Sequence, residues 1–216
     1  MEHPISIKEN LLFGWETFKK RPWFIIGAVL IMGVFSVSFS YEADSSGEIM
    51  AALPIMIALG LALGAIRLAV ELLFTRFMLM AHDSVETMTY METLPAKPFW
   101  KYVGGKIAVA VTVFAGIVLL VIPGIIAAIG FLFTPYLIVD RKLWPIEAMK
   151  ESWRITKGHK WQLFLLMLVL GLINIIGALA LFVGLLVSIP VSMLAVVHVY
   201  RALEKQSPPM PEVVTG

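Results

Sequence analysis

Three charged side chains, Arg67, Glu71 and Arg76, lie within a long apolar stretch of this 216-residue chain, and the first two could form a site. Arg67 and Glu71 are separated by one helical turn, so an α-helix places them on one face. A charge at the centre of a bilayer costs roughly 2.5–3.5 kcal/mol, and intramembrane charges therefore usually have a function. Two interpretations stay open: an ion pair near the membrane surface, or a polar path or headgroup site that another helix completes. Asn174, in a later apolar stretch, completes this candidate intramembrane polar site, although its simplest role is hydrogen bonding between helices.

Residue types that carry covalent or metal chemistry are scattered or missing. The chain has no cysteine, which excludes a thiolate nucleophile and Cys-ligated metals. His3, His82, His159 and His198 do not have the spacing of metal ligands. Ser152 has no base near it in the sequence. The sequence therefore predicts no catalytic, cofactor-binding or metal site, and no enzyme.

Composition places the chain in a membrane. Hydrophobic residues make up 59% of it, charged residues 15%, and the mean hydropathy is +0.88. A water-soluble domain has too little interior for that much apolar surface. The net charge of +2 is too small to indicate a nucleic-acid partner.

Six apolar segments are candidates for membrane spans, and a helix needs about 20 residues to cross the hydrocarbon. The short third and fourth meet at Pro123-Gly124, a pair typical of tight turns, and whether they cross fully stays open. Gly184 and Pro190 mark the middle of the last apolar run. The segments are residues 23–41, 49–81, 107–122, 125–139 and the two halves of 162–200.

Basic residues collect in alternate connections between these segments, while the other connections carry no Lys or Arg. The positive-inside rule then predicts that both termini are cytoplasmic. A signal-peptide core at residues 23–35 is the competing interpretation, but cleavage would remove part of the repeat described next. We expect some of the cytoplasmic basic residues to contact lipid headgroups or a partner: Lys19, Lys20, Arg21, Lys150, Arg154, Lys157 and Lys160.

The N-terminal part of the sequence resembles a segment in its second half. One shift superposes Trp15 on Trp153, Lys19 on Lys157 and Trp23 on Trp161. Residues 7–20 and 145–157 both have the pattern of an amphipathic helix that leads into an apolar segment. A fainter copy lies between Asp83 and Trp100. A chance match is the alternative, because basic amphipathic helices are common before membrane spans.

Capping signals support these boundaries. Ser6-x-x-Glu9 reads as a capping box, Pro145 suits the first turn of the second helix, and Gly158 suits a left-handed end. Asp83-x-x-Glu86 would cap the fainter copy.

The resulting prediction is an all-α integral membrane protein. Six transmembrane helices form three parallel repeats, and each repeat is an interfacial amphipathic helix followed by a transmembrane hairpin. The repeats span about 5–81, 83–140 and 144–203 within a single membrane domain at 1–205. Residues 206–216 are expected to be a disordered Pro-rich tail.

Three motifs in the second half of the chain together carry a resemblance to a known family: V-I-P-G-I-I at 121–126, T-P-Y-L-I-V-D at 134–140, and E-A-M-K-E-S-W-R-I-T-K-G at 147–158. Residues 100–205 resemble the membrane domain of the glycerophosphoryl diester phosphodiesterase family and related uncharacterised multi-span inner-membrane proteins of bacteria. The resemblance implies a helical fold in a bacterial inner membrane, with no activity assigned to that domain. The catalytic barrel of the longer relatives has no counterpart here.

The motif residues have structural interpretations. Pro123 and Gly124 would turn the chain, Pro135 would kink or end the fourth helix, and Asp140 would cap a segment or pair with a basic residue such as Arg141 or Arg154. Ser152 and Gly158 belong to the end of the second amphipathic helix. Tryptophans at 144, 153 and 161 are expected to be interfacial anchors. The structural motif set is Pro123, Gly124, Pro135, Asp140, Ser152, Trp153, Gly158 and Trp161.

The favoured function is therefore non-enzymatic: an accessory, scaffold or lipid-interacting protein that acts through its basic cytoplasmic helices. Its expected partners are the lipid bilayer, with anionic phospholipids preferred, and a protein partner or a second copy; no cofactor is expected. A small transporter or channel that uses Arg67, Glu71 and Asn174, with Ser188 and Ser192 on its path, is the alternative. A membrane-embedded enzyme is the least favoured class.

Overall fold

The computed structural model describes residues 6–36, 46–90, 99–119, 121–180 and 184–206. Within these ranges the chain forms helices and no strands, as the sequence predicts. The helices are α1 (Ile7–Lys20), α2 (Pro22–Ser36), α3 (Ser46–Ser84), α4 (Phe99–Leu119), α5 (Val121–Gly130), α6 (Thr134–Arg141), α7 (Pro145–Ile155), α8 (Lys160–Leu179) and α9 (Leu185–Gln206). The predicted Pro-rich tail lies outside the described residues, except Gln206, which ends α9.

Among the described residues, five helical segments are long and apolar enough to span a membrane. They are Ile57–Ser84, Phe99–Val118, Ile122–Arg141, Lys160–Leu179 and Leu185–Gln206. The first predicted apolar segment forms the shorter apolar helix Pro22–Gly33. The prediction of a helical protein with segments long and apolar enough to span a membrane is confirmed, whereas the arrangement of six spans as three parallel repeats is not.

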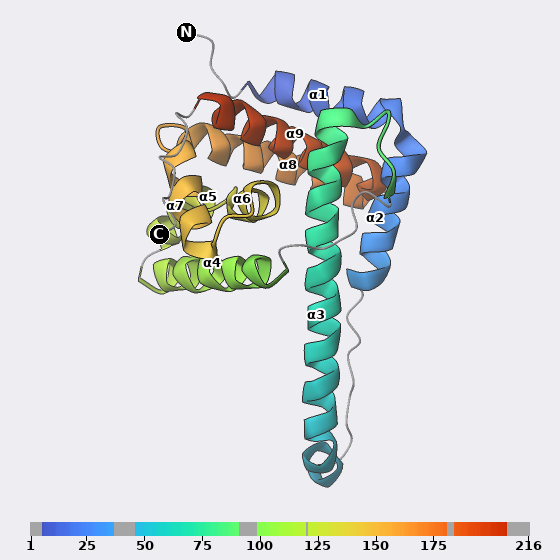
Figure 1. Ribbon diagram of the computed structural model, residues 1–216, viewed down its shortest axis with the longest axis vertical. Helices are drawn as coiled ribbons and strands as arrows, with labels where there is room; N and C mark the ends of the chain where they lie inside the picture. The colour runs from blue at the N-terminus through green and yellow to red at the C-terminus, as the bar shows by residue number, and fades with distance from the viewer. Residues whose placement is uncertain (1–5, 37–45, 91–98, 120, 181–183, 207–216) are drawn as a thin grey trace, which may run out of the picture.

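The helices do not form a simple parallel bundle (Figure 1). Helices α1, α9 and α8 lie side by side, and α3 runs across them with its N-terminal part extending away from the rest of the molecule. The side chains of Ile57, Leu59 and Leu61 on that extension are exposed and apolar.

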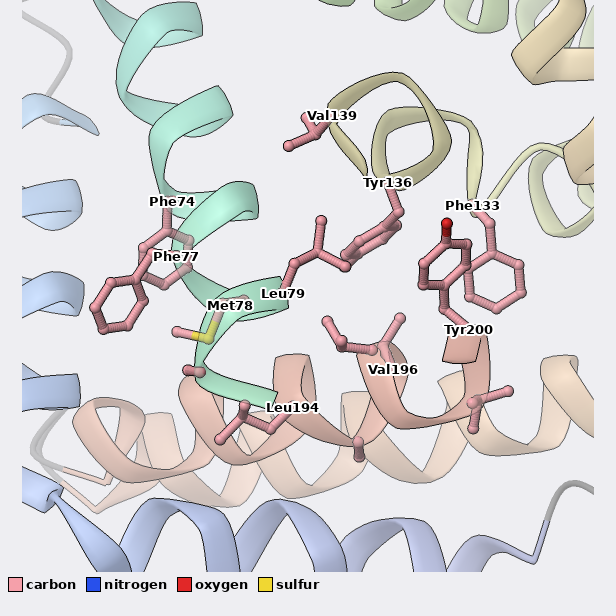
Figure 2. Close-up of a cluster of buried hydrophobic side chains, with 14 of the residues drawn as sticks. Phe74, Phe77, Met78, Leu79, Phe133, Tyr136, Val139, Leu194, Val196 and Tyr200 are labelled. Carbon is pink, nitrogen blue, oxygen red and sulfur yellow. The ribbon is translucent and has the colours of Figure 1, made fainter. Parts of the chain in front are cut away.

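The core lies where the C-terminal half of α3 meets α6 and α9 (Figure 2). Helix α9 contributes the most residues to it, and Pro190 is accommodated inside that helix. Figure 2 labels buried side chains that α3, the α6 region and α9 contribute to this core: Phe74, Phe77, Met78, Leu79, Phe133, Tyr136, Val139, Leu194, Val196 and Tyr200.

Helix α1 begins and packs as its sequence requires. The Ser6 hydroxyl accepts the Glu9 N–H at 3.4 Å, which confirms the predicted cap. Gly14 faces α9 so closely that any side chain would collide with the Val191 carbonyl oxygen. Trp15 remains on the exposed side of the helix.

Helix α7 also follows the prediction. Pro145 lies in its first turn, and the Glu147 carboxylate accepts the Trp144 N–H at 3.1 Å. Gly158, which follows the helix, has φ +87°, the left-handed conformation that favours glycine.

Pro123-Gly124 is not the turn itself, so this prediction is wrong in detail. Helix α4 ends at Leu119 and α5 begins at Val121, and the Pro-Gly pair lies in the first turn of α5. Proline is tolerated there because the first helical N–H groups have no intrahelical acceptor. A Cβ on Gly124 would lie 2.8 Å from the Ile117 backbone nitrogen, so glycine is needed for the close approach of α4 and α5.

The predicted break near Pro135 is present, but Pro135 begins α6 rather than ending α5. The chain leaves the helix after Gly130 and resumes at Thr134. Ser152 of α7 is fully buried at this break: its hydroxyl donates to the Gly130 carbonyl at 2.8 Å and accepts the Phe133 N–H at 3.2 Å. Ser152 therefore bonds two backbone groups at the break, and the Thr156 hydroxyl also donates to the Gly130 carbonyl at 3.3 Å.

The fainter repeat differs from its prediction. Helix α3 continues through Ser84, so Asp83 belongs to its last turn and does not cap a following helix. Residues 85–87 form a turn, Val85 and Met88 are buried, and residues 91–98 lie outside the described part of the chain.

Candidate functional site

The basic residues at the junction of α1 and α2 have two different roles. Lys19 and Lys20 are exposed; the Lys19 ammonium lies 5.7 Å from the centre of the Trp15 ring, and Lys20 pairs with Glu86 at 3.0 Å across the surface. Exposed ion pairs of this kind contribute little to stability. These two lysines therefore remain available to a headgroup.

Arg21 has a structural role instead. Its guanidinium donates to the carbonyls of Val85 at 3.3 Å and Met88 at 2.8 Å, and it lies 4.1 Å from the centre of the Phe24 ring. Arginine suits this task because several donors radiate from one plane. Arg21 thus links the start of α2 to the segment that follows α3, and its headgroup contact stays a prediction.

Arg154, on α7, also pairs within the protein. It binds the buried Glu151 carboxylate through two hydrogen bonds of 2.7 and 2.6 Å, and these bonds raise the pKa of Arg154. Arg141 approaches the same carboxylate at 3.7 Å. Since Glu151 is only 3% exposed, the pair compensates a charge that the fold would otherwise bury alone.

The remaining predicted basic residues lie on the open side of α7 and at the start of α8. Lys150 and Lys157 are exposed. The Lys160 ammonium lies 3.0 Å from the centre of the Trp153 ring, a cation–π contact. Trp144 and Trp161 are exposed as well, as expected for interfacial anchors.

An apolar groove of about 750 Å³ runs between α4 and α7. The stripe of α7 that the sequence analysis expected to be apolar forms one wall of it. Lys150 is the only charged residue among those that line it. The lining residues are Ala108, Val111, Thr112, Phe131, Ile146, Met149, Lys150 and Trp153.

The predicted Arg67–Glu71 pair is wrong. Glu71 forms its ion pair with Lys106 of α4 at 2.5 Å, and Arg67 is exposed on α3. The buried hydroxyls of Thr75 and Tyr102 lie 3.5 Å apart beside this pair. Lys106 lies 35 positions from Glu71 in the sequence, so only the packing of α4 on α3 brings the two side chains together.

Asn174 joins a different part of the molecule. Its amide donates to the Ser192 hydroxyl at 3.3 Å, which links α8 to α9, as expected for a hydrogen bond between membrane helices. Ser188, one turn before Ser192, is buried on the same helix. The three predicted intramembrane polar residues are therefore not one site: Glu71 belongs to the α3–α4 contact and Asn174 to the α8–α9 contact.

Sequence analysis missed an ion network at the ends of three helices. Arg201 of α9 binds Asp140 of α6 at 2.6 Å and Asp83 of α3 at 2.7 Å, and Tyr200 donates to Asp140 at 3.0 Å. Asp140 thus has a structural role, as predicted, but with Arg201 rather than Arg141 or Arg154. The partners are 61 and 118 positions apart, so no local pattern signals them.

Two of the scattered histidines also come together. His82 Nε2 and His198 Nδ1 are 3.1 Å apart, and the Phe13 ring stacks on His198 with centres 4.0 Å apart. His82 Nδ1 in turn contacts the Asp83 carboxylate at 2.8 Å. Among the residues that the structure describes, no group of three His, Cys, Asp or Glu side chains is placed to hold a metal ion.

No family model, curated protein or solved structure matches this chain. The resemblance of residues 100–205 to the phosphodiesterase membrane domain therefore stays a prediction.

Proposed function

We propose that this chain is a non-enzymatic, multi-pass protein of the bacterial inner membrane that interacts with anionic lipid through its amphipathic helices α1 and α7. One observation carries the proposal: both helices pack against the rest of the protein and still leave a tryptophan and a lysine partly or fully exposed at the surface. Trp15 and Lys19 hold these positions on α1, and Trp153 and Lys157 hold them at the end of α7. Indoles and lysines together favour the headgroup region of a bilayer.

The exposure of tryptophan supports a bilayer environment. All six tryptophans lie in described segments, and the least exposed of them, Trp153, is still 39% exposed. In water such exposure of large apolar rings is costly, whereas at a membrane interface it is the favoured position. Both termini are proposed to be cytoplasmic because the basic residues favour that side.

Equivalent contacts of α1 and α7 support the proposed repeat of amphipathic helix and hairpin for the first and third units. Gly14 meets the Val191 carbonyl on α9, and Ser152, the residue that the sequence shift superposes on Gly14, bonds the Gly130 carbonyl at the end of α5. Each amphipathic helix thus docks on the second helical arm of another hairpin. The buried positions correspond as well: Asn10, Gly14, Thr17 and Phe18 on α1 match Ala148, Ser152, Ile155 and Thr156 at α7.

Hairpin packing repeats too. A Cβ on Gly116 would lie 3.0 Å from the Gly124 Cα, and one on Gly184 would lie 2.7 Å from the Gly177 Cα. The α4–α5 and α8–α9 hairpins therefore both close on a pair of glycines.

Native mass spectrometry tests the lipid proposal. The protein is released from nanodiscs of equimolar phosphatidylglycerol and phosphatidylcholine, and the bound lipids are counted. We expect phosphatidylglycerol to be enriched, and the enrichment to fall in the variant Lys19→Gln/Lys157→Gln. The matched control is Lys8→Gln/Lys205→Gln, which removes the same charge from two other exposed positions. Equal retention of both lipids by the unmodified protein would contradict the proposal.

A second candidate function is transport along α8 and α9. Asn174 Oδ1 and Ser188 Oγ are buried without a hydrogen-bond partner among the described residues, and unsatisfied polar atoms favour a hydrated path. Ion flux into liposomes that Asn174→Leu and Ser188→Ala both abolish would support this candidate. Absence of flux from the unmodified protein would remove it.

A further inference from the structure

The groove between α4 and α7 has the chemistry of a site for a hydrocarbon chain. Val111, Ile146 and Met149 line it with aliphatic groups, and Phe131 and Trp153 add aromatic surface. The Thr112 hydroxyl donates to the Ala108 carbonyl at 2.8 Å within its own helix, so it does not need water from the groove. A volume of about 750 Å³ lies in the usual range for small-molecule sites.

The charge at the edge of the groove is positive. Lys150 lines it, and the Lys160 ammonium lies over the Trp153 ring that forms part of its wall. The acidic residues of α7 are committed elsewhere, because Glu147 accepts the Trp144 N–H and Glu151 binds Arg154. An occupant with an apolar chain and an anionic head therefore matches both parts of the surface.

We propose that this groove binds one acyl chain of an anionic phospholipid, with the lipid phosphate beside Lys150. The proposal rests on the membrane location and lipid interaction proposed above, and it adds a single defined site. The wall supplied by α4 belongs to the membrane-spanning segment Phe99–Val118, so a lipid in the bilayer reaches the groove sideways without leaving the hydrocarbon. The amphipathic helix α7 then covers the chain and offers the lysine to the head.

A photoreactive phosphatidylglycerol tests this site. The lipid carries a diazirine on one acyl chain and is incorporated with the full-length protein into nanodiscs of phosphatidylglycerol and phosphatidylcholine. We expect light to label peptides from α4 and α7 that line the groove. Ala108→Trp fills the groove and should abolish this labelling, whereas Ala110→Trp, at an exposed position outside the groove lining, should leave it unchanged.

Lys150→Gln provides the second measurement, because Lys150 is exposed and its loss does not disturb a buried contact. One lysine near an anionic headgroup corresponds to about a fivefold change in affinity, so groove labelling by phosphatidylglycerol should fall about fivefold. Lys157→Gln is the matched control, with groove labelling retained. If Ala108→Trp fails to fold, the Lys150 and Lys157 variants decide.

The outcomes separate the two proposals. Enrichment of phosphatidylglycerol on the protein with no labelling in the groove overturns the site and leaves the proposed function standing. Groove labelling that is equal with a phosphatidylcholine probe and unchanged in Lys150→Gln overturns the headgroup assignment. Crosslinks between two protein copies at the groove would show that a second copy occupies it, and would overturn the lipid assignment. Loss of all phosphatidylglycerol enrichment contradicts the proposed function itself.

Discussion

Helices α1 and α7 each pack on another helical hairpin through corresponding positions, but the contacts at these positions differ in chemistry. Helix α1 meets α9, which is continuous, and presents Gly14 so that the two backbones touch. Helix α7 meets the chain where α5 has stopped, and presents Ser152, whose hydroxyl bonds two backbone groups. The partner determines the residue: α9 comes so close at Val191 that only glycine fits, whereas the broken helix leaves a carbonyl and an N–H for a hydroxyl to bond.

The residue that precedes the contact residue also differs between the two helices. Glu151, before Ser152, is a buried carboxylate that holds Arg154, while the residue before Gly14 is Phe13, which stacks on His198. One helix therefore fixes its neighbours through charge and the other through an aromatic ring.

Ser152→Val should reduce the free energy of unfolding more than any other single substitution considered for α1 and α7. The Gly130 carbonyl loses its shortest hydrogen bond and the Phe133 N–H loses its acceptor, both in a buried place, so we expect about 2 to 4 kcal/mol of destabilisation. The free energy of unfolding in mixed micelles, from a detergent titration followed by circular dichroism, measures this. Ser192→Val is the control at another buried serine. A loss below that of the control would mean that the break does not depend on Ser152.

Gly14→Val tests the other docking. The added side chain meets backbone atoms of α9, which cannot move aside as a side chain would, and overpacking of this kind costs roughly 1 to 3 kcal/mol. The same titration measures it, and Gly33→Val, where a Cβ has open space, serves as control. Unchanged stability in Gly14→Val would show that α1 does not need this close approach.

Glu151→Gln tests how much the ion pair with Arg154 contributes to stability. The neutral amide still accepts hydrogen bonds but no longer balances Arg154, and because Arg154 is 37% exposed we expect only about 1 kcal/mol. Thermal unfolding in detergent measures the change. Combining it with Arg154→Gln should give less than the sum of the two single losses; a simple sum would mean that the two side chains are not coupled.

Lys157→Gln should have the smallest effect on stability, within about 0.5 kcal/mol, because the side chain is exposed. We expect this substitution to lower the enrichment of phosphatidylglycerol instead. A large loss of stability in thermal unfolding would show that Lys157 supports the fold rather than a headgroup.

Local rules predicted the features that depend on neighbouring residues. The cap at Ser6, the start at Pro145 and the left-handed Gly158 each follow from one residue and its backbone. The Pro123-Gly124 prediction failed because the same pair suits both a turn and a first helical turn, and the choice depends on how closely α4 approaches.

Pairs that join distant segments could not be predicted. Glu71 has a basic residue one turn away in sequence, yet it binds Lys106, and Asp140 is next to Arg141 yet binds Arg201. His82 and His198 look unrelated until α3 and α9 cross. In each case several side chains are suitable partners, and tertiary packing determines which of them is close enough. That packing cannot be read from a single sequence.

The hydroxyl of Ser152 also bears on how the chain is made. During synthesis α5 and α6 leave the ribosome before α7, so the Gly130 carbonyl and the Phe133 N–H enter an apolar environment ahead of the side chain that satisfies them. In the proposed bilayer location, these two backbone groups gain their Ser152 partner only when α7 docks. Assembly of this part of the protein is then a joint event of two hairpins, completed by Ser152 together with Thr156, whose hydroxyl also donates to the Gly130 carbonyl at 3.3 Å.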